Sequence, residues 1–140
     1  MFRKIFLAIV LVLGEPMTVH SAINERLECI PQKAVATQPF MSGRYGTTHD
    51  VGDVLPLNRN ETSNTVIDFK NNTSWNMIGS VRTGGPLPIT IPTLSNNLYY
   101  FKYNIETGPV GSIRFLLDKD SRKLLAKYEY YDVFSACRKV

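Results

Sequence analysis

The chain has 140 residues, of which 44% are hydrophobic and 20% are charged, and its 16 Lys and Arg against 12 Asp and Glu give a formal net charge of +4. This length provides for one small domain and excludes two. The basic surplus is compatible with RNA or anionic surfaces and equally with an ordinary domain, because no run of basic residues marks a contact strip.

The first 21 residues have the order of a secretory signal peptide. A positive segment at Arg3 and Lys4 precedes an apolar run, and a polar segment ending in small residues follows. The apolar run is too short to cross a bilayer, which takes about 20 residues. We therefore expect a signal peptide over residues 1–21, a single domain over 22–140, and a secreted product without a membrane-spanning segment.

Two cysteines remain after the signal peptide, Cys29 near the start of the domain and Cys137 near its end. An even cysteine count in an exported protein predicts a disulfide, with two free thiols or an intermolecular bridge as the alternatives. A disulfide between these two cysteines would close a loop over most of the domain, which stabilises the fold by about 4 to 5 kcal/mol in the chain-entropy model. We expect no metal or cofactor, because His49 is the single histidine of the domain and two cysteines cannot complete a zinc site with it.

Between the first cysteine and about residue 97 the chain is rich in Gly, Pro, Asn, Ser and Thr, which is typical of loops and short strands. The best helix candidate lies within residues 32–42, although Pro39 interrupts it. Residues 83–88 predict a turn-rich loop that leads into a short strand at 89–91.

The last third predicts three strands, at residues 98–105, 113–117 and 124–131, which short turns join into an antiparallel meander. Alternation places one set of side chains on a common, core-facing side: Tyr99, Phe101, Tyr103, Ile105, Ile113, Phe115 and Leu117. Tyr100 points to the opposite side and is the aromatic residue expected to be exposed. A base-stacking role for the aromatic residues is the alternative to a core role. The sequence therefore predicts one α+β domain dominated by antiparallel sheet.

Three asparagines, Asn60, Asn71 and Asn72, match the acceptor pattern for N-glycosylation, which matters only in a eukaryotic secretory route.

Taken together, the signal peptide, the early Cys29, the Tyr-rich strand and turn that begin at residue 98, and Cys137 before a basic C-terminus resemble the ribonuclease-like secreted effectors of powdery mildew fungi. The resemblance implies the fold of small guanyl-specific ribonucleases. In that fold, one short helix packs on a twisted antiparallel sheet and one disulfide joins the ends.

RNA cleavage through the 2′-hydroxyl needs a general base, a general acid and a cation near the phosphorane. Active ribonucleases of this type present a Tyr and a His, a Glu, an Arg and a final His in chain order. Here Tyr45, His49, Glu61 and Arg82 follow that order, and no histidine follows His49. We expect a protein that is not an enzyme; if it is active, His49, Glu61 and Arg82 are the catalytic set.

The resemblance implies an effector that acts in the cytoplasm of a host plant cell and suppresses defence by binding host proteins or RNA, with a host immune receptor as a further candidate partner. We expect a monomer without membrane contact. The side chains predicted to contact RNA are Arg44, Tyr45, Arg82, Lys102, Arg114 and Lys127. The alternatives are an active guanyl-type ribonuclease and a bacterial exported small β-barrel that binds or inhibits a partner.

Overall fold

The computed structural model describes residues 23–42, 46–57 and 62–140, so the predicted signal peptide lies outside the described part of the chain. The first half contains the strands β1 (Arg26–Ala36), β2 (Phe40–Ser42), β3 (Thr47–His49), β4 (Val54–Leu55), β5 (Asn64–Asp68) and β6 (Thr73–Ile78). The second half contains β7 (Val81–Pro88), β8 (Thr93–Ser95), β9 (Leu98–Lys102), β10 (Arg114–Asp118), β11 (Lys123–Lys127) and β12 (Tyr131–Lys139).

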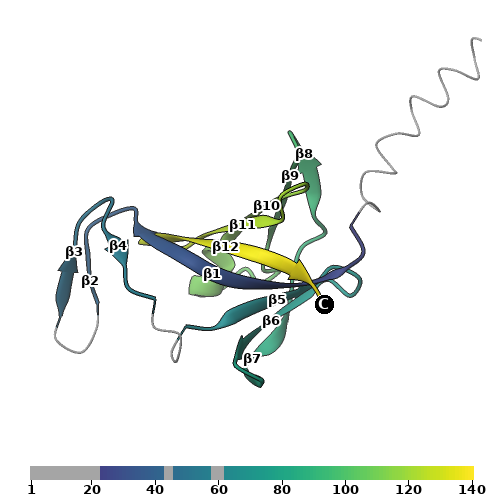
Figure 1. Cartoon of the computed structure of the whole chain (residues 1–140), viewed down its shortest axis with the longest axis horizontal. Coiled ribbons are helices and arrows are strands. Elements are labelled where there is room, and N and C mark those ends of the chain that lie inside the picture. The colour runs from purple at the N-terminus through teal and green to yellow at the C-terminus, as the bar shows by residue number, and fades with distance from the viewer. Residues whose placement is uncertain (1–22, 43–45, 58–61) are drawn as a thin grey trace, which may run out of the picture.

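These strands form one large antiparallel sheet and one separate hairpin. The order in the sheet is β7-β6-β5-β1-β12-β11-β10-β9-β8, and β4 pairs with the second half of β1. The hairpin of β2 and β3 stands apart from the sheet at one end of the molecule (Figure 1). The predicted meander of the last third is confirmed as β9, β10 and β11.

The sheet curls until its two ends meet. The chain leaves β7 and pairs again at Ile89, which bridges to Tyr103 just after β9. The Thr90 amide donates to the Lys102 carbonyl at 2.9 Å, and the Asn104 amide donates to the Pro88 carbonyl at 2.8 Å. This closure gives the sheet an inner face around the core and an outer face toward solvent.

The first and last strands lie side by side along their whole length, as the purple-blue and yellow ribbons of Figure 1 show. Cys29 and Cys137 occupy directly opposite positions in this pair and form a disulfide that spans 108 residues of sequence. The predicted intramolecular pairing is therefore confirmed. The register shifts once, at a bulge between Pro31 and Lys33.

The core follows the predicted alternation. Tyr99, Phe101 and Tyr103 are buried on the inner face together with Phe115 and Leu117. Rings pack directly on one another there, because residues opposite each other in neighbouring strands share a face. The Phe101 and Phe115 rings, for example, stack with their centroids 5.1 Å apart. The two remaining residues of the predicted set, at positions 105 and 113, are only half-buried.

The predicted helix within residues 32–42 is wrong, and with it the α+β class. Residues 32–36 belong to β1, and 40–42 form β2. Pairing with β12 on one side and β4 on the other overrides the local signal for a helix. Within the described residues the helical structure is limited to one short 3₁₀ turn, Pro109–Ser112.

The predicted loop at residues 83–88 is also wrong, because this segment is part of β7. Its glycines and prolines are tolerated because β7 lies at the end of the strand order and pairs with β6 through an irregular register.

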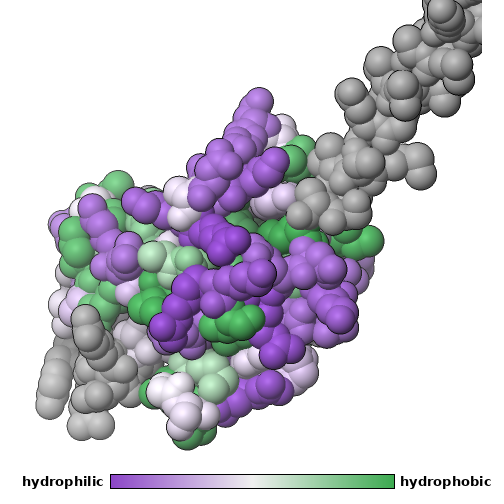
Figure 2. All heavy atoms as spheres, turned by 45° about the vertical axis from the view of Figure 1, so that its right-hand side comes forward, coloured by the Kyte–Doolittle hydropathy of each residue, from purple (hydrophilic) through white to green (hydrophobic). Residues whose placement is uncertain are grey.

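On the face shown in Figure 2, hydrophilic and hydrophobic side chains are mixed in small patches without one broad apolar area. Among the described residues no helix has the length and apolar character needed to cross a membrane.

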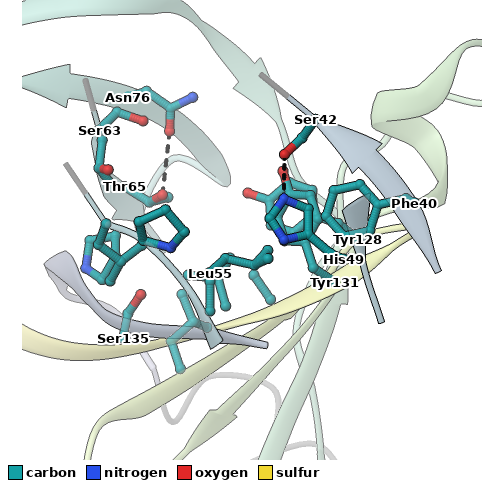
Figure 3. A pocket seen from close by; sticks show the side chains of 18 residues that line it. Phe40, Ser42, His49, Leu55, Ser63, Thr65, Asn76, Tyr128, Tyr131 and Ser135 are labelled. Atoms are coloured by element: carbon teal, nitrogen blue, oxygen red, sulfur yellow. Dashed lines mark hydrogen bonds between the residues drawn. The ribbon is translucent and has the colours of Figure 1, made fainter. Parts of the chain in front are cut away.

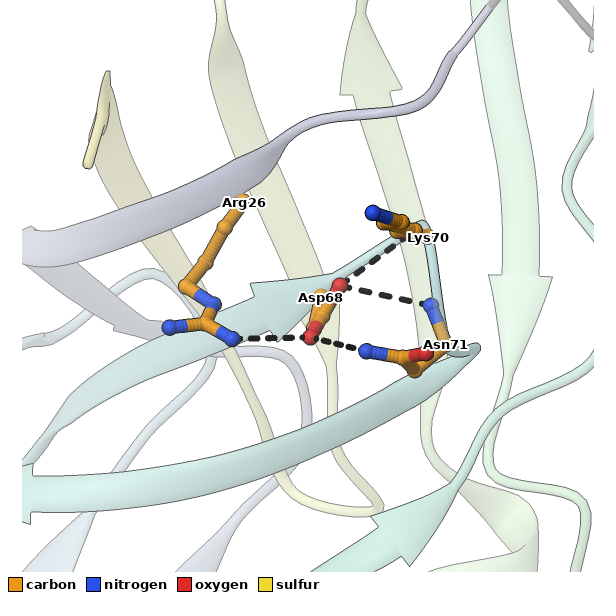
Figure 4. A network of polar contacts seen from close by, with 4 residues as sticks. All are labelled: Arg26, Asp68, Lys70 and Asn71. Atoms are coloured by element: carbon orange, nitrogen blue, oxygen red, sulfur yellow. Dashed lines mark hydrogen bonds and ion pairs between the residues drawn. The ribbon is translucent and has the colours of Figure 1, made fainter.

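A buried carboxylate ties β1 to β5. Asp68 accepts hydrogen bonds from the Arg26 guanidinium at 3.1 Å, the Asn71 side chain at 2.9 Å and two backbone amides of the following turn (Figure 4). Burial by itself raises the pKa of this carboxyl, but the hydrogen bonds from Asn71 and Arg26 outweigh that effect and hold the pKa below its ordinary value.

We predict that replacing both cysteines by alanine lowers the free energy of unfolding by about 4 to 5 kcal/mol, because the unfolded chain gains the freedom of an open loop. Urea unfolding under oxidising conditions measures the change. A reducing agent should destabilise the parent protein and leave the double variant unchanged. A variant as stable as the parent would contradict a constraining role for the disulfide.

We also predict an acid-dependent contribution from Asp68. Because its folded-state pKa lies below the unfolded value, its stabilisation is present above about pH 4 and is lost as the pH falls through the folded-state pKa. Asp68→Asn should therefore be less stable than the parent at neutral pH, and the gap should close in acid. Thermal unfolding between about pH 2 and pH 7 measures this gap. Asp50→Asn, at an exposed turn position, is the control. A gap independent of pH would exclude the ionised carboxylate as the cause.

Candidate nucleic-acid interface

Three of the cations predicted to contact RNA meet on the outer face of the sheet. Arg114 in β10 lies directly opposite Lys102 in β9 on one side and Lys127 in β11 on the other. Residues in such register project to the same face, about 5 Å apart. We call these three residues the cationic row.

An apolar row of side chains lies beside it on the same face, two residues away along each of these strands. Tyr100, Leu116, Leu125 and Phe134 are successive cross-strand partners on β9, β10, β11 and β12. The two aromatic residues lie at the ends of this row and are 41% and 42% exposed, whereas the two leucines between them are half-buried. The predicted exposure of Tyr100 is thus confirmed.

Residues of the two rows line two shallow hollows on this face. One, of about 450 Å³, is bordered by the cationic row together with Tyr100 and Leu116. The other, of about 420 Å³, is bordered by Leu116, Leu125 and Phe134, with Lys33 and Lys123 at its rim. Leu116 belongs to both, so the hollows are neighbours on one face.

Like charges directly opposite one another in a sheet are unfavourable. In the part of the chain that the structure describes, the cationic row has one carboxylate within ion-pair distance, Asp132 in β12, whose Oδ2 lies 3.3 Å from the Lys127 ammonium. The Arg114 guanidinium donates to the Gly111 carbonyl at 2.8 Å, which orients it without neutralising it. Within the described residues the row therefore keeps a positive surplus that an anionic ligand would neutralise.

Arg82, also predicted to contact RNA, lies elsewhere. Its guanidinium carbon is 4.5 Å from the ring centroid of Trp75, and that of Arg26 is 5.3 Å from the same ring. These cation–π contacts fix Arg82 at the β6–β7 end of the sheet. Four predicted residues lie outside the described part of the chain: Arg44, Tyr45, Asn60 and Glu61.

The other two predicted glycosylation positions lie in the turn before β6. The Asn71 side-chain nitrogen, which would carry a glycan, donates to Asp68. Asn72 is half-buried and has a left-handed backbone with φ of 51°.

His49 lines a cavity of about 390 Å³ on the inner side of the sheet (Figure 3). Its Nε2 lies 2.7 Å from the Ser42 hydroxyl, and its ring packs on Phe40 at 4.9 Å between centroids. Neither Arg82 nor any member of the cationic row lines this cavity. The predicted catalytic partners His49 and Arg82 are therefore not brought to a common site.

Among the described residues, no three His, Cys, Asp or Glu side chains form a group that could hold a metal ion.

Comparison with known proteins gives no assignment. A scan against protein-family models found no match, and searches of curated proteins and of solved structures found none either.

Sequence reasoning missed Phe134 because it did not treat residues 132–139 as a strand. The aromatic and β-branched residues at positions 131, 133 and 134 were the available strand signal. It missed Leu125, which lies in the predicted strand 124–131, because it assigned no face to the side chains of that strand.

We predict that Lys102→Gln raises the free energy of unfolding by about 0.2 to 1 kcal/mol at low ionic strength, because it removes one cross-strand repulsion with Arg114. The gain should shrink as salt screens the charges. Chemical unfolding at low and high salt provides the measurement, with Lys70→Gln in an exposed turn as the control. Equal effects of the two substitutions would show that Lys102 is not under local repulsion.

Proposed function

We propose that this protein is a secreted binding protein that holds single-stranded RNA on the outer face of β9 to β12 and does not cleave it. The observation that carries this proposal is the alignment of the cationic row with the exposed aromatic residues Tyr100 and Phe134 on one face.

The two rows match the two parts of a nucleotide. Strands are about 4.8 Å apart, so the three cations extend over about 10 Å, a length suited to consecutive phosphates. Aromatic rings on the adjacent row offer a stacking surface to bases, and stacking tolerates any base. This arrangement favours an unpaired strand, because the bases of a duplex are already stacked on one another and are not free to reach Tyr100 or Phe134.

The separation of His49 from the cationic row supports binding without cleavage. A phosphate on the row would have no histidine beside it, since His49 lines the inner cavity and is the single histidine after residue 21. General acid–base catalysis needs such a group within hydrogen-bond reach of the reacting oxygen.

We further propose, from the sequence resemblance, that the RNA belongs to a plant host in whose cytoplasm the protein acts as an effector. The proposal that the protein binds RNA does not depend on the identity of the host, because it follows from the cationic row and the apolar row. An apolar row between cations would also suit an acidic host protein, and the experiment below distinguishes the two ligands.

We predict that the disulfide-bonded protein binds a fluorescently labelled, unstructured RNA of about 12 nucleotides, within the range of single-strand site sizes. Fluorescence anisotropy measures the affinity, and gel electrophoresis should recover the RNA intact. Tyr100→Ala should weaken binding by about fivefold to a hundredfold through lost stacking. Tyr130→Ala, whose tyrosine is equally exposed at 41% but lies between β11 and β12, should bind like the parent.

The salt dependence tests the cations in the same experiment. Three phosphate contacts predict a slope of about −2 for the logarithm of affinity against the logarithm of salt concentration. Lys127→Ala should reduce the magnitude of this slope by about 0.7. Absent or salt-insensitive RNA binding would reject the RNA proposal in favour of a protein ligand, and RNA cleavage that His49→Ala abolishes would replace it with an enzyme.

A further inference from the structure

The inner face of the sheet is filled at one end and hollow at the other. At the disulfide end large side chains such as Leu27, Ile67 and Leu117 are fully buried. Past the bulge in β1, the inward positions of β1 and β11, on either side of β12, hold Ala34 and Ala126, both buried. Because strand spacing fixes the distance across the sheet, these small side chains leave space that larger ones would fill.

That space is the cavity of about 390 Å³ in Figure 3. Ala34, Val133 and Ala126 are successive cross-strand partners that form its floor, and Leu55 in β4 lies opposite Ala34. The β2–β3 hairpin contributes Phe40, and residues 128 and 131 contribute two tyrosines whose rings stack at 5.0 Å. Its volume lies at the lower end of the range for small-molecule sites.

Among the described lining residues, hydrogen-bonded pairs of polar side chains occur at two places around the cavity. The Ser42 and His49 pair lies on the hairpin side, and the Thr65 hydroxyl donates to the side-chain oxygen Oδ1 of Asn76 at 3.3 Å on the opposite side (Figure 3). The Asn76 side-chain amide, which lines the cavity, carries two N–H donors in addition to this acceptor.

The Tyr128 hydroxyl is also suited to donate a hydrogen bond. Burial, with smaller effects from the neighbouring Tyr103 and Tyr131, raises the pKa of Tyr128 to about 12. Its hydroxyl therefore keeps its proton at neutral pH.

The lining contains no Lys, Arg, Asp or Glu among the described residues. A charged ligand would lose hydration there without gaining a counter-charge, which is costly. The aromatic walls favour a planar ring.

We propose that this cavity is a binding site for a small uncharged molecule with an aromatic ring and one or two hydrogen-bonding groups. This site is separate from the RNA surface, because its lining shares no residue with either row. The proposal for this cavity does not depend on whether the protein binds RNA.

The experiment uses two fluorophores of the same ring system, neutral N-phenylnaphthylamine and its sulfonated analogue anilinonaphthalene sulfonate. We expect saturable fluorescence enhancement with one neutral probe per protein, and affinity at least about tenfold weaker for the sulfonate. Ala126→Leu fills the floor and should weaken the neutral probe about tenfold or more.

Because added volume at a buried position can destabilise the fold, Leu55→Trp, at a half-buried position of the cavity wall, provides a second variant with the same expected loss. Val81→Trp, at an exposed position of β7, is the matched control and should bind like the parent. Tyr100→Ala should also leave probe binding unchanged, which separates this site from the RNA surface. Absent saturable binding, equal binding of the two probes, or unchanged binding in folded Ala126→Leu and Leu55→Trp would overturn the proposal.

Discussion

The pairing of the first strand with the last is the constraint on which the rest of the structure depends. β1 lies between β5 and β12, so it joins the strands that follow it to the meander that ends the chain. Without this contact the two groups of strands would share no ladder at the centre of the sheet. The Cys29–Cys137 disulfide lies across the same pair and restricts the unfolded chain where the closing contact is most distant in sequence.

Closure of the sheet gives each strand two different environments. Inward side chains of β9 to β11 build an aromatic core with Phe101 and Phe115 stacked at its centre. Outward side chains of the same strands are free from packing constraints and carry the cationic and apolar rows. A row of like charges is unfavourable for the folded state, and this cost to stability is consistent with the proposed role in binding an anionic ligand.

The described residues contain no α-helix, so the structure departs from the fold that the resemblance to ribonuclease-like effectors implies. The fold that the resemblance implies has a helix packed on the sheet, whereas here the sheet itself curls around the inner face, and the β2–β3 hairpin lines one side of the inner cavity. The proposed RNA binding therefore relies on the outer surface of this chain. The same curl leaves the inner cavity beside His49.

The sequence alone was sufficient for features that depend on near neighbours: the alternation of the meander, the burial of Tyr99, the exposure of Tyr100 and the single possible disulfide. It could not decide which strands pair, because pairing depends on contacts between residues far apart in the chain. For that reason residues 32–36 carried a weak helix signal and yet form part of β1, and the glycine-rich segment 83–88 forms β7 at an edge that tolerates it. Lys102, Arg114 and Lys127 could each be selected as cations from the sequence, but only the register of β9, β10 and β11 places them side by side. The cavity likewise depends on register, since Ala34 in β1 and Ala126 in β11 leave a hollow only when the sheet places them on either side of Val133 on the inner face.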